Sequence, residues 1–181
     1  TEHLDWSFHK VMRRWIQDGQ QTAPANELLH RWWNHWENQS PQNIIPPPTP
    51  EAYSIVMSGW AHEGEPERTL LLLQDLQTRN HVTPQVSHFE TCLNAFLRAT
   101  LNLRHSRGRH VGYDAESVLL QMTEWLEAQG DGLVGRRVPS ASSVGTDRSY
   151  ETTVLQNLNK VVHCWVDARH TEAPIRATSI L

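Results

Sequence analysis

One pattern of apolar residues occurs four times in the chain, and this repetition restricts the possible folds more than any other feature. Residues 6–19, WSFHKVMRRWIQDG, align with residues 51–64, EAYSIVMSGWAHEG, through apolar residues at positions i, i+3, i+4, i+7 and i+8. The other two copies are FETCLNAFL, residues 89–97, and LNKVVHCWV, residues 158–166. This spacing places the apolar residues on one side of an α-helix. Each copy therefore predicts an amphipathic helix.

A second helical pattern follows each copy of the first. It consists of a small residue with apolar residues three, four and seven positions later, and it begins at Ala25, Thr69, Ala115 and, cut short, at Ala177. The repeating unit is then a helix, a short turn and a second helix, and units of this kind bury their apolar faces by stacking on one another. We expect an all-α fold, an α-solenoid of about four helical hairpins with the last one truncated.

The expected arrangement is a single helical-repeat domain over residues 1–181. Two helices, or one helix and the start of a second, are expected in 5–37, 50–80, 88–128 and 156–181. The repeats occupy residues 5–40, 50–85, 86–130 and 155–181, with a loop insertion at 100–113 in the third and a linker at 131–150. The core is expected to contain apolar residues of both patterns, namely Met12, Trp15, Leu29, Met57, Trp60, Leu73, Leu93, Phe96, Leu119 and Trp165.

Three tryptophans fall within five positions of HRWWNHWENQ, residues 30–39. Tryptophan rings bury a large apolar surface, and they can also stack on bases. Trp32 takes the last apolar position of the second helical pattern and Trp36 lies one turn further on, so packing between helices is the favoured interpretation. The alternative is that Trp33 faces a partner or stacks on a base.

The repeating unit resembles that of the pentatricopeptide repeat (PPR) family, in which about 35 residues form two antiparallel helices. The features in common are an aromatic residue that opens the first helix, an A-x-x-hydrophobic-L-x-x-M pattern in the second, and a proline near the end of the unit. The best copy is residues 50–86, and residues 163–181 look like repeats common in algal members. Tetratricopeptide repeats are the runner-up, but their first helix opens with a different spacing of tryptophan and glycine.

The resemblance implies a protein of mitochondria or plastids in which two residues of each unit contact one RNA base. Matched position by position, these candidate RNA contacts are the pairs His9 with Thr49, Ser54 with Gln85 and Glu90 with Val154, and the single residue Asn159. The pairs recognised in the family combine Thr, Ser or Asn with Asn or Asp. None of the three complete pairs in this chain does so, which weighs against sequence-specific RNA reading.

The remaining motifs predict no catalytic, metal or cofactor site, so we expect a protein that is not an enzyme. GDGLVG, residues 130–135, matches G-x-G-x-x-G but follows a predicted helix instead of a strand, so it is interpreted as a connector. His88 and Cys92 are four residues apart, but no CxxC or HExxH motif supports a metal site. No apolar run is long enough for a membrane span.

The most basic stretch is RATLNLRHSRGRH, residues 98–110, with four arginines and no acid. Its residues Arg104, Arg107 and Arg109 lie in the loop insertion, where we expect them to contact a partner's acidic side chains, carbonyls or phosphates.

The whole chain carries a net charge of −4, whereas a general nucleic-acid binder is usually basic. We therefore favour a structural scaffold subunit of a large organellar assembly, bound to other protein subunits. The alternative is an RNA-binding factor in organellar RNA processing or translation. A continuous basic groove on the concave face of the solenoid would favour RNA, and a neutral or acidic groove with basic loops elsewhere would favour the scaffold.

Overall fold

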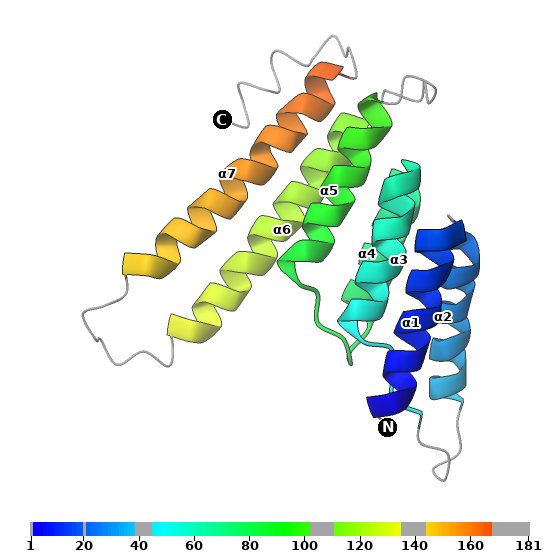
Figure 1. Ribbon diagram of the computed structural model, residues 1–181. Helices are drawn as coiled ribbons and strands as arrows, with labels where there is room; N and C mark the ends of the chain where they lie inside the picture. The colour runs from blue at the N-terminus through cyan, green and yellow to red at the C-terminus, as the bar shows by residue number, and fades with distance from the viewer. Residues whose placement is uncertain (1, 20, 39–44, 102–110, 135–143, 168–181) are drawn as a thin grey trace. The chain divides into compact units, whose positions relative to one another are not determined.

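The computed structural model describes residues 2–19, 21–38, 45–101, 111–134 and 144–167, and every regular element in these ranges is an α-helix (Figure 1). The all-α expectation is confirmed for this part of the chain, which contains no strand. In chain order the helices are α1 (Glu2–Gly19), α2 (Thr22–Glu37), α3 (Pro50–Glu63), α4 (Pro66–Thr78), α5 (Val86–Leu101), α6 (Val111–Val134) and α7 (Val144–Asp167).

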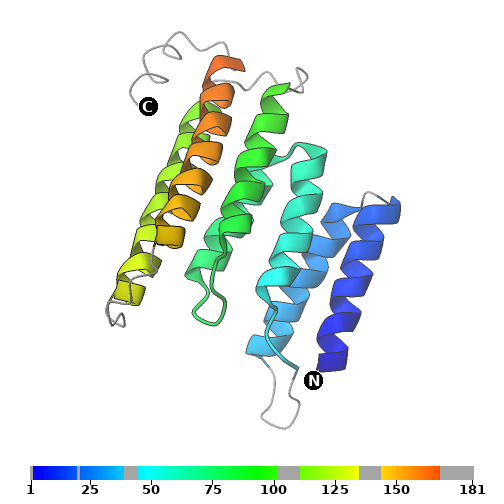
Figure 2. The same ribbon diagram turned by 60° about the vertical axis from the view of Figure 1, so that its left-hand side comes forward.

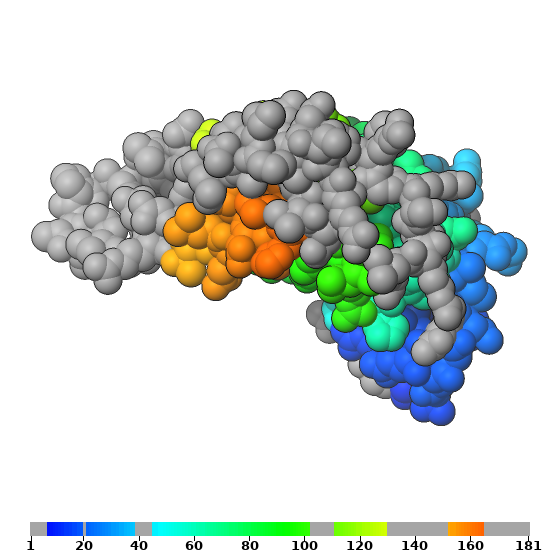
Figure 3. All heavy atoms as spheres, turned by 90° about the horizontal axis from the view of Figure 1, so that it is seen from above, coloured from blue at the N-terminus to red at the C-terminus, as the bar shows by residue number. Residues whose placement is uncertain are grey.

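The chain divides into two compact units, residues 1–95 and 96–181, with the boundary inside α5. In the first unit, α1 packs against α2 and α3, α2 also packs against α3, and α3 packs against α4. The turned view shows α1 and α3 side by side (Figure 2), and the space-filling view shows the blue atoms of the first hairpin adjoining the cyan atoms of the second (Figure 3). In the second unit, α6 packs along α7.

The second hairpin shows how the sequence sets the ends of its helices. Pro50 begins α3 after Thr49, whose backbone is extended, and a proline is tolerated there because a first-turn N–H has no helical partner. Gly64 ends α3 in the left-handed conformation, with φ of 75°, which glycine adopts without steric cost. Pro66 then begins α4. The turn between the two helices is short, so α3 and α4 run antiparallel.

Most of the residues expected in the core are buried. In the first unit these are Met12, Leu29, Met57, Trp60, Leu73 and Leu93, and in the second they are Phe96 and Leu119. The side chain of Trp165 lies outside the described residues.

The prediction that Trp15 belongs to the core is wrong, because its side chain is only half-buried. The equivalent residue of α3, Trp60, is 4% exposed. The same contrast separates Val11 of α1, 41% exposed, from Val56 of α3, 0% exposed. Helix α3 packs against α1, α2 and α4, whereas α2 and α3 leave one side of α1 open. The repeated pattern marks the apolar face correctly, but burial of that face depends on its neighbours.

Gly59 allows the two hairpins of the first unit to approach closely. A Cβ atom added to this residue of α3 would lie 2.5 Å from Oγ1 and 2.7 Å from Cγ2 of Thr22. Thr22 begins α2 and is buried. The start of α2 therefore occupies the space that a side chain at position 59 would need.

The segments between the later helices differ in part from expectation. Helix α6 continues to Val134 and α7 begins at Val144, so both ends of the linker expected at 131–150 are helical. The connector interpretation of GDGLVG is wrong for residues 130–134, since glycine costs a helix only about 1 kcal/mol and does not by itself end one. Arg104, Arg107 and Arg109 lie outside the described residues, as does the second helical pattern of the fourth repeat, which starts at Ala177.

Candidate binding groove between α1 and α3

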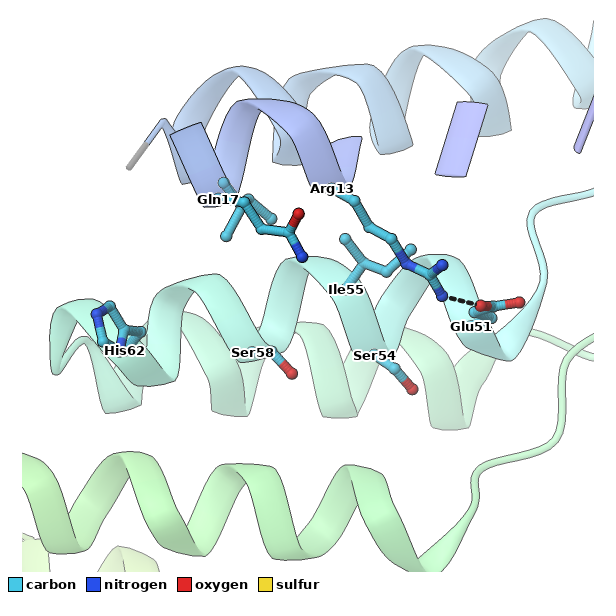
Figure 4. A pocket seen from close by; sticks show the side chains of 8 residues that line it. Arg13, Gln17, Glu51, Ser54, Ile55, Ser58 and His62 are labelled. Carbon is cyan, nitrogen blue, oxygen red and sulfur yellow. Dashed lines mark hydrogen bonds and ion pairs between the residues drawn. The ribbon is translucent and has the colours of Figure 1, made fainter. Parts of the chain in front are cut away.

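A groove of about 690 Å³ lies along the first helices of the first two hairpins (Figure 4). Its lining residues recur every three or four positions, so each helix contributes one stripe to the groove. From α1 these residues are Arg13, Ile16 and Gln17, and from α3 they are Glu51, Ser54, Ile55, Ser58 and His62.

Among the lining residues that the structure describes, the one arginine and the one carboxylate are paired with each other. Arg13 reaches from α1 and forms an ion pair with Glu51 at the start of α3 (Figure 4). Glu51 also lies 3.6 Å from Nδ1 of His9. Both members of the Arg13–Glu51 pair are about half exposed, so the pair adds little to stability. Its consequence is electrostatic, because the formal charges of these two lining residues cancel.

The structure brings together the first expected pair, His9 and Thr49. Thr49 Oγ1 lies 2.9 Å from Nε2 of His9, within hydrogen-bonding distance. His9 is buried, and Thr49, which directly precedes α3, is partly buried. The two positions are neighbours, as the resemblance implies, but their polar atoms are bonded to each other.

The second expected pair, Ser54 and Gln85, is joined through His88. The Gln85 backbone N–H donates to Nδ1 of His88 at 2.9 Å. On the other side of the ring, Nε2 lies 3.0 Å from Ser54 Oγ and 2.9 Å from the Pro50 carbonyl oxygen. His88 is 0% exposed and holds the start of α5 against α3. Sequence reasoning missed this role, because one buried histidine has no distinguishing pattern.

The contact between Ser54 and His88 has the distance of a nucleophile and its general base, but the histidine tautomer excludes that chemistry. Because Nδ1 accepts a backbone N–H, the hydrogen of the neutral ring is on Nε2. That nitrogen can donate to the Pro50 carbonyl but cannot accept the proton of Ser54. A catalytic histidine needs the opposite tautomer. The contact therefore serves packing.

The other candidate contacts do not form a third pair within one unit. Glu90 is half-buried on α5 in the first unit. Val154, half-buried, and Asn159, exposed, both lie on α7 in the second unit.

The alternative in which Trp33 faces a partner or stacks on a base is wrong, because its side chain is 1% exposed. Its ring meets Trp36 edge to face at 5.4 Å and lies 6.5 Å from Tyr53. The guanidinium carbon of Arg79 lies 4.5 Å from its centroid. The favoured interpretation, packing between helices, is confirmed for this ring.

A partly buried polar network beside Trp33 connects the two hairpins. Tyr53 donates a hydrogen bond of 2.6 Å to Asp75, and Arg79 pairs with Asp75 at 3.2 Å and with Glu37 of α2. Burial, and then the Asp75 carboxylate, raise the pKa of Tyr53. Burial alone would lower the pKa of Arg79, but the carboxylates of Asp75 and Glu37 help to hold it above its ordinary value. The network stabilises the charged arginine and the neutral tyrosine.

The described part of the chain contains no group of three or more His, Cys, Asp or Glu residues placed to hold a metal ion. Within the same residues, none of the helices is both long and apolar enough to cross a membrane. Comparisons with models of known families, with curated proteins and with solved structures found no match to this chain. Inference about function therefore depends on the chain's own residues.

Proposed function

We propose that this chain is a non-catalytic helical-repeat binding module, a structural subunit of a large organellar assembly. Two hairpins with the same pair of apolar patterns pack together in the first unit, which supports a stacked-repeat architecture. The resemblance of these patterns to pentatricopeptide repeats supports a solenoid of such units and a location in a mitochondrion or plastid.

The paired charges and bonded polar atoms of the α1–α3 groove favour a protein partner over RNA. Binding to a phosphate backbone draws its affinity from lysines and arginines that replace counterions. Arg13, the one arginine among the described residues that line this groove, is already paired with Glu51. The polar atoms at the expected base-reading positions, His9 with Thr49 and Ser54 with His88, are bonded within the protein. RNA binding would have to break these contacts before it gained its own.

The proposal is tested by isolating the tagged full chain from organelles and following its mass by sedimentation, with and without ribonuclease. We expect the chain to stay in a large particle with the same protein subunits after ribonuclease treatment. Release of the free chain by ribonuclease would instead support the alternative, an RNA-binding factor in organellar RNA processing or translation. Recovery of the chain only as a free monomer in both samples would refute the scaffold.

Arg104, Arg107 and Arg109 remain the proposed contact residues of the third repeat. Replacing all three by alanine should weaken co-purification of the partner subunits. The unfolding midpoint should change little, since insertion length and surface charge contribute little to stability. A triple variant that co-purifies normally would remove these residues from the proposal.

A further inference from the structure

We propose that the α1–α3 groove binds an uncharged peptide segment of a partner protein, with an aliphatic side chain against Ile16 and Ile55 and a peptide group bonded to Gln17 and Ser58. The inference rests on the proposed scaffold function and specifies the chemistry that one of its surfaces recognises. Three properties of the groove lead to it: an apolar floor, two unused hydrogen-bonding side chains and cancelled charges.

The apolar floor comes from one isoleucine on each helix. Ile16 and Ile55 both line the groove and are half-buried, so part of each side chain remains open. Ile16 lies beside Gly59 of α3, since a Cβ atom added to that glycine would be 3.1 Å from the Ile16 Cδ1. An aliphatic side chain seated here would cover apolar surface that is already ordered, so little further ordering is needed on binding.

Two polar side chains of the groove are uncommitted. Ser54, Arg13 and Glu51 all make bonds within the protein. By contrast, the Gln17 amide and the Ser58 hydroxyl form no hydrogen bond or ion pair with any residue that the structure describes. An amide and a hydroxyl can each donate and accept, which complements the N–H and C=O of a peptide group. Gln17 extends from α1 and Ser58 lies on α3, so the two helices both contribute (Figure 4).

The charges of the groove select a neutral ligand. Arg13 and Glu51 compensate each other at one end. His62, at the other end of the α3 stripe, already has an interaction within the protein. Among the described residues of the groove, a phosphate backbone would find no unpaired arginine, and a strongly acidic or basic peptide would find no unpaired arginine or carboxylate of opposite charge. An uncharged segment with one aliphatic anchor fits all three properties.

The test uses the full chain and a phage-displayed library of random peptides as the probe. We expect the enriched peptides to be uncharged and to share an aliphatic residue. A synthetic copy of one enriched peptide is then titrated against the protein and its variants. Ser58→Arg places a long charged side chain in the groove and should lower the affinity by about tenfold or more, because it fills space that the peptide needs and leaves a charge facing an uncharged ligand.

Two further variants distinguish a loss of peptide affinity caused by changes in the groove from a loss that a substitution elsewhere on the surface would also cause. Gln17→Ala should also weaken binding, because it removes the amide without adding bulk. The matched control is Leu71→Arg, which adds the same charge on α4 at a residue that is 64% exposed and absent from the groove lining. It should bind like the wild type. All three substitutions are on exposed helix positions, and circular dichroism verifies that each variant is folded.

Any of four results would overturn the inference. The first three are no enriched peptide, peptides whose affinity is unchanged by Ser58→Arg and Gln17→Ala, and equal losses in Leu71→Arg. Displacement of the peptide by oligouridylate at similar concentration would overturn it in favour of nucleic acid. If no peptide binds but the chain remains in a ribonuclease-resistant assembly, this inference fails while the proposed function stands.

Discussion

Replacing Gly59 by alanine should destabilise the first unit, although alanine is the better helix former. The new Cβ would lie 2.5 Å from Thr22 Oγ1, about 0.9 Å closer than the 3.4 Å at which ordinary contact begins. Rotation of the threonine gives only partial relief, since both Oγ1 and Cγ2 face this position and one of them would remain close. Overpacking costs about 1–3 kcal/mol. The gain in helix propensity is about 1 kcal/mol, so we expect a net loss of up to about 2 kcal/mol.

A double-mutant cycle with Thr22→Ala isolates this contact. In the Thr22→Ala background the two closest atoms are gone, and the remaining tight neighbour is the end of the Ile16 side chain at 3.1 Å. Gly59→Ala should then be close to neutral or stabilising, which gives a coupling of about 2 kcal/mol. Urea unfolding followed by tryptophan fluorescence is the assay, because six of the eight tryptophans lie in the first unit. Gly19→Ala is the control, since its neighbours are atoms of the flexible Gln21 side chain. A stable Gly59→Ala variant, or no coupling to Thr22, would refute the close packing of α2 on α3.

Three further predictions follow from burial and hydrogen bonding. Trp60→Ala should cost about 3–5 kcal/mol and Trp15→Ala clearly less, because only the former is fully enclosed; equal losses in urea unfolding would contradict this. The pKa of Tyr53 is raised in the fold, so the stability that the neutral tyrosine contributes is present below about pH 10 and is lost as the pH rises further. In Tyr53→Phe the free energy of unfolding should therefore fall less steeply at alkaline pH. A fluorophosphonate probe should leave Ser54 unlabelled, because His88 Nε2 carries the ring hydrogen; labelling detected by mass spectrometry would contradict the tautomer.

The helices of this protein could be predicted because their signals are local. Apolar spacing identified the faces of α1, α3 and α5, and the ends of α3 and α4 follow from the conformational limits of Gly64, Pro50 and Pro66. Burial was less predictable, because it depends on which helix covers a face. Trp15 and Trp60 occupy the same position in the repeat, yet only Trp60 has neighbours on all sides.

The candidate site could be predicted only in outline. The family resemblance named His9 with Thr49 and Ser54 with Gln85 as pairs, but it did not reveal that His88 contacts both members of the second pair. The groove combines side chains from two helices about forty residues apart in sequence, and its neutrality depends on the pairing of Arg13 with Glu51. Arg13 and Glu51 are on different helices, so their pairing depends on how the helices pack. The spacing of residues within one helix does not predict it.

The most direct test of the central claim, that this chain binds protein and not RNA, is a titration of the purified full chain with fluorescently labelled single-stranded RNA over a range of salt. With the groove charges cancelled, we predict no saturable binding tighter than the range of about 10⁻⁴–10⁻⁶ M typical of non-specific contacts at physiological salt. Tighter binding that weakens steeply with added salt, and that is reduced by substitutions at Gln17 or Ser58, would contradict the account and assign the groove to RNA.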